Sequence, residues 1–296
     1  MRKMLFTLLA VLILCSGCAA GEDAAPQFIR TYSHQDHLTN GVVTGTNDFY
    51  YQFNSQGLVT CLETYRDDTL FSRSTWEYDE FGNIIHHTEE QDGTIKEYDY
   101  KIELDEAGHM LWQEIWLGDV RTRLREITYN RQGEEATHHV TAWHEDGQLD
   151  GSGDYTMTYN WKGQLTRQVH LLASGAEYVW EYQDGLCVRE TSYEAESHAV
   201  SYYWEYTYDE KDRCIRQARY AGDGTLELYH EYVYDDTART KTRTCYLADG
   251  TVDNYFDVFT YDEHGNQIMQ ERYEDGEVYW RIQDTYELLE TDPERS

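Results

Sequence analysis

Proline, basic residues and long apolar runs are all scarce in this sequence. Only two of its 296 residues are proline, and no apolar run follows Leu14. Lysine and arginine together number 24 against 56 aspartates and glutamates, for a formal net charge of −32. A surface this acidic repels nucleic acid and anionic lipid head groups, so nucleic acid is not an expected partner.

Recognisable catalytic motifs are also absent. The body of the chain contains no Gly-x-Ser-x-Gly, P-loop, His-Glu-x-x-His or Cys-x-x-Cys pattern. Carboxylates are so numerous that no acid–base pair stands out, and they are better explained as one solvated face of a sheet. We therefore expect a protein that is not an enzyme and holds no cofactor.

Cysteine in the body of the chain is limited to Cys61, Cys187, Cys214 and Cys245. Cys187 and Cys214 occupy equivalent places one repeat apart, in "GLCVRE" and "DRCIRQ". In a meander they lie two strands apart, about 9–10 Å, beyond the roughly 7 Å reach of a disulfide. We interpret them as small strand residues.

Metal sites are not expected either. His86 and His87 adjoin, while His138 and His144 are far enough apart on an extended strand, about 20 Å, that the two cannot chelate one ion. The insertion at 144–154 places three aspartates among glycines, which suits calcium, but it lacks the glutamate of an EF-hand loop. We interpret it as an acidic hairpin.

Tyrosine, in contrast, is abundant, and it recurs at a fixed period. An aromatic or apolar residue precedes a turn every 23 to 30 residues, most often 25 or 26. About halfway through most units comes a second turn, usually Asp-Gly, a strong hairpin signal. These anchors are Phe53, Tyr78, Leu104, Tyr129, Tyr159, Tyr182, Tyr208, Tyr234, Tyr261 and Tyr286.

The segments between turns alternate with a period of two. Tyr202, Trp204, Tyr206 and Tyr208 share one strand face, and charged or polar residues share the other. The pattern predicts an all-β antiparallel meander of about 18–20 strands, two per repeat of about 26 residues. So many strands must curl, so we expect a wide barrel or a two-layer sheet.

The first residues have the features of an export signal. Arg2 and Lys3 precede an apolar run too short to span a bilayer, and "LCSGC" at 14–18 resembles the lipobox of bacterial lipoproteins. The resemblance implies a signal peptide at 1–17, a lipid on Cys18, a tether at 18–26, and a protein held at a bacterial membrane, facing outward or the periplasm. A single β domain at 27–290 and a tail at 291–296 complete the predicted organisation.

Two units carry a second resemblance. "YDEFGN" at 78–83 and "YDEHGN" at 261–266 resemble the YD repeats of Rhs proteins, teneurins and short bacterial lipoproteins. The unit at Tyr234 departs from the pattern because it lacks the turn glycine. In large Rhs proteins such repeats form a shell around a toxin. The resemblance implies the repeat architecture here, and no toxin domain follows Tyr286 in this sequence.

Three classes of function follow from these observations. We expect first a membrane-anchored lipoprotein that binds or scaffolds an envelope protein or glycan. The alternatives are an immunity or accessory protein of an Rhs-like toxin system and, less favoured, a glycan-active enzyme. An outer-membrane barrel is disfavoured because residues 120–129 place charge on both strand faces. The candidate ligand-contact aromatics are Trp112, Trp116, Trp180, Trp204 and Trp280.

Overall fold

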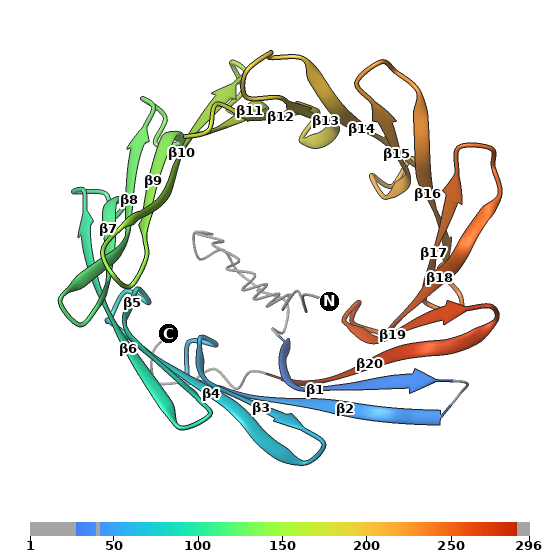
Figure 1. The fold of residues 1–296 in the computed structure, drawn as a ribbon, viewed down its shortest axis with the longest axis horizontal. Helices are drawn as coiled ribbons and strands as arrows, with labels where there is room; N and C mark the ends of the chain where they lie inside the picture. Colours follow the sequence, from blue (N-terminus) through green and yellow to red (C-terminus); the bar gives the residue numbers. More distant parts are fainter. Residues whose placement is uncertain (1–27, 40–41, 289–296) are drawn as a thin grey trace.

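The computed structural model describes residues 28–39 and 42–288, which form twenty antiparallel strands (Figure 1). The signal peptide, Cys18, the tether and the tail lie outside the described residues. The strands are β1 (Phe28–Thr39), β2 (Val42–Phe53), β3 (Val59–Arg66), β4 (Thr69–Tyr78), β5 (Ile84–Gln91), β6 (Thr94–Leu104), β7 (Met110–Leu117), β8 (Val120–Tyr129), β9 (Glu135–Trp143), β10 (Leu149–Tyr159), β11 (Leu165–Leu172), β12 (Glu177–Gln183), β13 (Leu186–Tyr193), β14 (Val200–Tyr208), β15 (Cys214–Ala221), β16 (Leu226–Asp235), β17 (Thr240–Leu247), β18 (Val252–Tyr261), β19 (Gln267–Glu274) and β20 (Glu277–Leu288).

The sheet closes on itself. Each strand pairs with its neighbours in sequence, and β1 pairs with β20 in antiparallel register from Phe28↔Leu288 to His37↔Trp280. Figure 1 shows the blue first strand beside the red last one. An even number of strands allows this antiparallel closure, which leaves no unpaired edge. The predicted meander and strand number are confirmed; of the two predicted arrangements the barrel is correct and the two-layer sheet is wrong.

Two sets of connections form the two ends of the barrel. We call the end with the connections after even-numbered strands the even rim; it also holds the start of β1 and the end of β20. In the loop between β4 and β5 the Asp79 side chain holds the turn together. Its Oδ1 accepts the backbone N–H of Phe81 at 2.9 Å and that of Asn83 at 2.8 Å. Gly82 takes φ +85°, which explains the glycine of the repeat.

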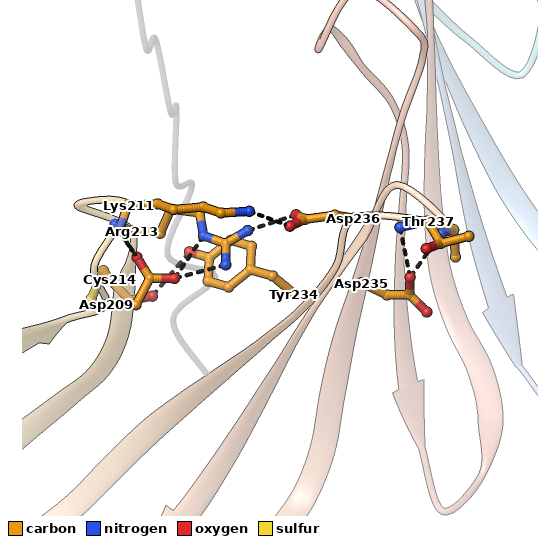
Figure 2. A network of polar contacts seen from close by, with 9 residues as sticks. Asp209, Lys211, Arg213, Cys214, Tyr234, Asp235, Asp236 and Thr237 are labelled. Carbon is orange, nitrogen blue, oxygen red and sulfur yellow. Dashed lines mark hydrogen bonds and ion pairs between the residues drawn. The ribbon is translucent and has the colours of Figure 1, made fainter.

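The unit at Tyr234, which lacks the turn glycine, closes by another route. After Tyr234, the Asp235 carboxylate accepts the N–H groups of Thr237 and Ala238, and Arg239 adopts φ 55° where most units have glycine. In the unit at Tyr208, Asp212 takes the corresponding conformation at φ 59°. The neighbouring loop supports this turn, since Lys211 and Arg213 both reach Asp236, at 2.6 and 2.7 Å (Figure 2). Ion pairs between loops thus accompany a strained backbone position.

The tyrosine before each turn has a structural role. The hydroxyl of Tyr78 donates to the carbonyl of Val59 at 2.6 Å, and that of Tyr208 to the carbonyl of Cys187 at 2.7 Å. Each bond ties the end of an even strand to the start of the preceding odd strand. The same bond recurs at Tyr129, Tyr159 and Tyr234. This contact explains why the repeat contains tyrosine at this position, where phenylalanine has the same shape but no donor.

The two faces of the sheet differ in crowding. Trp204 of β14 and His230 of β16 stack with ring centroids 5.9 Å apart across the intervening strand β15. Strands two apart are separated by about 9–10 Å, so side chains on this face converge, as they do inside a curved sheet. We call it the lumen face; the opposite, outer face exposes residues such as Glu205 and Glu231. Among the described residues no helix is long and apolar enough to cross a membrane.

Candidate functional site

The five candidate tryptophans do not form one stripe. Trp180, Trp204 and Trp280 lie on the lumen face, where each is partly buried. Trp112 and Trp116 of β7 lie on the outer face, because the register pairs them with the outer-face residues Glu103 and Asp99. These two candidates therefore do not share the face of the other three. In β7 (Met110–Leu117) large side chains occupy both faces of the strand, so the sequence shows no alternation of polar and apolar residues. The pattern therefore did not reveal which residues face the lumen.

The lumen face carries aromatic rows that the sequence analysis did not select. His138, Tyr155 and His170 stack across β9, β10 and β11 with centroid distances of 5.0 and 3.9 Å. On the other side of β8, Trp76 stacks on His87 at 4.9 Å with nearly parallel rings. The rings face one another along the barrel wall, so their edges and polar atoms are directed away from the stack.

Burial on the lumen face alters the acidity of its tyrosines. Burial, together with the carboxylate of Glu190, raises the pKa of Tyr206 far above its usual value. Burial also raises the pKa of Tyr208 to about 12. These phenols stay protonated at physiological pH: the hydroxyl of Tyr206 donates to Glu190 and that of Tyr208 to the Cys187 carbonyl, so each can still accept a hydrogen bond from a ligand.

One cluster of charges on the lumen face is built around a fully buried carboxylate. Asp257 of β18 is 0% exposed and accepts hydrogen bonds from Arg243 Nε of β17 and Arg272 Nε of β19, both at 2.9 Å. Lys241 lies two residues before Arg243 on the same face, with its amine 4.1 Å from the Phe259 ring centroid. We call Lys241, Arg243, Asp257 and Arg272 the lumen cation cluster.

The surroundings of this cluster explain its electrostatics. Burial and the nearby Arg243 guanidinium lower the pKa of Lys241. The Arg272 guanidinium lies 4.4 Å from the Tyr255 ring centroid and 5.4 Å from that of Trp280. Contact with aromatic faces stabilises a cation that has left bulk water. The two arginines are each about one-quarter exposed, so their remaining N–H groups are within reach of solvent.

Charge is segregated between the two faces of the barrel. Cations on the lumen face outnumber the acids there, although the whole chain is strongly acidic. Most of the acidity therefore lies on the outer face and in the turns, and the prediction that a solvated sheet face explains the abundant carboxylates is consistent with this arrangement. The lumen cations are Arg30, Arg66, Lys96, Arg123, Arg125, Arg219, Lys241, Arg243 and Arg272, and the lumen acids are Glu89, Glu190, Asp253, Asp257, Glu274 and Asp284.

The four cysteines within the described residues are free thiols. Cys61 and Cys245 are buried, and Cys187 and Cys214 are partly buried, each bonding the carbonyl two residues on in its own strand. Burial raises the pKa of Cys187 to about 11, which makes it a poor nucleophile. The four residues are thus structural in their surroundings, in agreement with the interpretation of Cys187 and Cys214 as strand residues.

The predicted acidic hairpin is the turn between β9 and β10. His144 Nε2 lies 3.3 Å from Asp150, and His139 Nδ1 lies 2.6 Å from Asp154, while Asp146 accepts a backbone N–H at 2.9 Å. The three aspartates therefore serve three different partners. Among residues 28–39 and 42–288, no group of three or more histidines, cysteines or carboxylates could hold a metal ion.

Comparison with known proteins identifies no family. No family model matches the chain, and no curated protein matches it. Among solved structures, TcdB2-TccC3-TEV is 15% identical over 90% of this chain and 20% of that chain, with a TM-score of 0.35. A porin-like protein from Bacteroides uniformis is 11% identical over 87% of this chain and 98% of that chain, also at 0.35. The chain spans about one-fifth of the length of the first of these.

Proposed function

We propose that this protein is a non-enzymatic lipoprotein of the bacterial envelope, with YD-like repeats, that binds a glycan on the lumen face of its barrel. The observation that carries the proposal is the composition of that face. It combines partly buried tryptophans, protonated tyrosines and cations, whereas the outer face is predominantly acidic. Aromatic side chains with a few placed polar groups are typical of ligand-binding surfaces.

The fold supports a passive binding role over chemistry. A closed barrel of twenty strands is wide enough to enclose a ligand or a channel. Its stability is distributed over neighbouring strand pairs, so the lumen face is a preformed surface on rigid elements. The most buried carboxylate of the lumen face, Asp257, is committed to two arginines, which leaves it poorly placed for general acid–base chemistry.

The anchor is the second part of the proposal. A lipid on Cys18 stands ten residues before Phe28, which begins β1 at the even rim. A tether that short would hold the even rim toward the membrane and the opposite end away from it. The expected result of a Cys18→Ala substitution is release of the protein from the membrane fraction. Palmitate incorporation in growing cells measures the lipid directly, and unchanged labelling of the variant would refute the anchor.

Tryptophan fluorescence tests the binding role. The full-length chain in detergent is titrated with a panel of neutral and acidic polysaccharides, and a saturable change is expected for at least one. Trp204→Phe removes a lumen reporter and should diminish that change. Trp112→Phe, on the outer face of β7, is the matched control and should preserve it. A response that disappears only with Trp112→Phe would place the ligand outside the barrel.

The acidic outer face favours one further candidate. An accessory or immunity protein of a toxin system would use such a surface to bind a basic partner. Deletion of the gene should then sensitise cells to a toxin encoded nearby. Equal survival of deleted and intact cells would exclude this role and leave the glycan-binding role standing.

A further inference from the structure

The lumen cation cluster carries more positive than negative charge. Asp257 is the only carboxylate within 4.0 Å of Arg243 or Arg272 in the part of the chain that the structure describes. Within the same residues, Lys241 has no carboxylate at that distance and contacts aromatic rings instead. With three cations and one anion, the cluster has an excess of two positive charges.

The side chains in contact with the cluster do not neutralise this excess. β16 presents His230 and Tyr232 to the cluster, β18 presents Tyr255 and Phe259, and β20 presents Trp280. None of these side chains is acidic. Glu274 of β19, two residues from Arg272, and Asp253 of β18, beside Cys245, are the acids that also face this region, and neither forms an ion pair with the three cations. Burial and the adjacent Arg243 lower the pKa of His230, so this ring is neutral at physiological pH. Partly desolvated cations without a counter-charge are stabilised by any anion that can reach them.

The cluster combines two features that one class of ligand requires together. Arginine presents a planar fork of donors that matches a carboxylate, and Asp257 fixes the orientation of both forks. Beside them, Tyr255 and Trp280 offer aromatic surface within contact distance of Arg272. In a sugar acid the carboxylate is bonded to a carbon of the pyranose ring, and the C–H groups of that ring form an apolar face. One sugar residue can therefore contact both the cations and the aromatic rings of the cluster.

We propose that the lumen cation cluster binds the carboxylate of an acidic polysaccharide, of the class built from uronic acids. The inference rests on the proposed glycan-binding function and specifies its ligand. Lys241 supplies the charge that no carboxylate pairs with in the described residues, and it acts beside the Nη1 groups of the two arginines, which do not bond Asp257.

The net negative charge of the chain does not oppose this assignment at physiological salt. The Debye length at 0.15 M ionic strength is about 8 Å, so charges beyond the opposite side of the sheet are largely screened. The cations at the contact itself act at hydrogen-bond distance. The outer face repels the same polysaccharide, and this repulsion favours the lumen as the place of binding.

The test compares two trisaccharides that differ only in charge. Calorimetric titration of the full-length chain in detergent uses trigalacturonic acid and its methyl ester, which has the same rings and linkages without the carboxylates. Lys241→Gln should weaken binding of the acid about 10- to 100-fold, the effect of losing one charge-assisted hydrogen bond, and leave the ester unchanged. Lys101→Gln is the matched control: this lysine also lies over an aromatic ring, Trp116 at 4.2 Å, but on the outer face.

The outcomes separate this inference from the function on which it rests. Selective binding of the acid that Lys241→Gln weakens and Lys101→Gln does not supports the assignment. Equal binding of acid and ester, insensitive to both substitutions, overturns the assignment while glycan binding stands. Absence of binding by either trisaccharide, together with a flat response to the polysaccharide panel, refutes glycan binding itself. Circular dichroism of each variant establishes that it is folded.

Discussion

Closure of the barrel makes the effect of deletions depend on whether an even or an odd number of strands is removed. Removal of residues 209–234 takes out β15 and β16 with their turns and joins Tyr208 to Asp235. The junction restores the Tyr-Asp pair found at the end of the removed unit, and eighteen strands can still close in antiparallel register. Removal of residues 209–221 takes out β15 alone. The strands after it then reverse direction, and β20 would meet β1 in parallel.

The energetic difference can be worked from the closing pair. β1 and β20 share nine register pairs. At roughly 0.2–1 kcal/mol for each cross-strand pair, failure to close costs about 2–9 kcal/mol and exposes two long edges. The eighteen-strand variant keeps every remaining strand paired and should lose much less.

Urea unfolding followed by tryptophan fluorescence measures the free energy of unfolding of both variants, and gel filtration measures their association. We expect the 209–234 deletion to stay monomeric and cooperative, and the 209–221 deletion to unfold at lower urea or to aggregate through its free edges. Equal stability and equal monodispersity of the two deletions would refute closure by β1 and β20 as a main source of stability.

Three further predictions concern single side chains. Tyr208→Phe removes the hydroxyl that donates to the Cys187 carbonyl and should lower the free energy of unfolding in urea by about 1 kcal/mol. Tyr246→Phe on the outer face should lower it less. Similar losses in the two variants would contradict a structural role for the Tyr208 hydroxyl. Asp257→Ala leaves two partly buried guanidinium groups without their carboxylate and should cost about 3–5 kcal/mol, measured in the same way; a loss below 1 kcal/mol would show that solvent replaces Asp257. Burial lowers the pKa of His230, so the unfolded chain binds a proton more readily, and stability should fall as the pH drops below about 6.5. His230→Gln should reduce the change in urea midpoint between pH 7.5 and 5.5. The same change in the variant as in the unsubstituted protein would exclude His230 as a cause.

Much of the architecture was predictable because it rests on local chemistry. The Asp-Gly turns, the Asx loops after the anchor residues and the period-two alternation each depend on residues close together in the chain, and their spacing leads directly to a meander. The sequence alone did not assign the two faces of β7, where Trp112 and Trp116 belong to the outer face. An unbroken run of large residues does not reveal which of two alternating sets is buried.

The contacts among charged side chains could not be predicted from the sequence either. Arg243, Asp257 and Arg272 are separated by about fifteen residues, and nothing in the three separate strands distinguishes them from other charged residues. Antiparallel pairing places them side by side, and curvature decides that they face inward, among rings from β16 to β20. His138, Tyr155 and His170 are brought into one stack in the same way.

The sequence by itself determined the repeat, the two strands in each unit, the turn at each end and the acidic character of the chain, because these follow from backbone conformations and composition that neighbouring residues control. Only the tertiary structure decided the strand number at closure, the face that turns inward and the partners of Asp257. Those properties depend on register and curvature summed around the whole ring, and a shift of one residue in any strand would exchange its two faces.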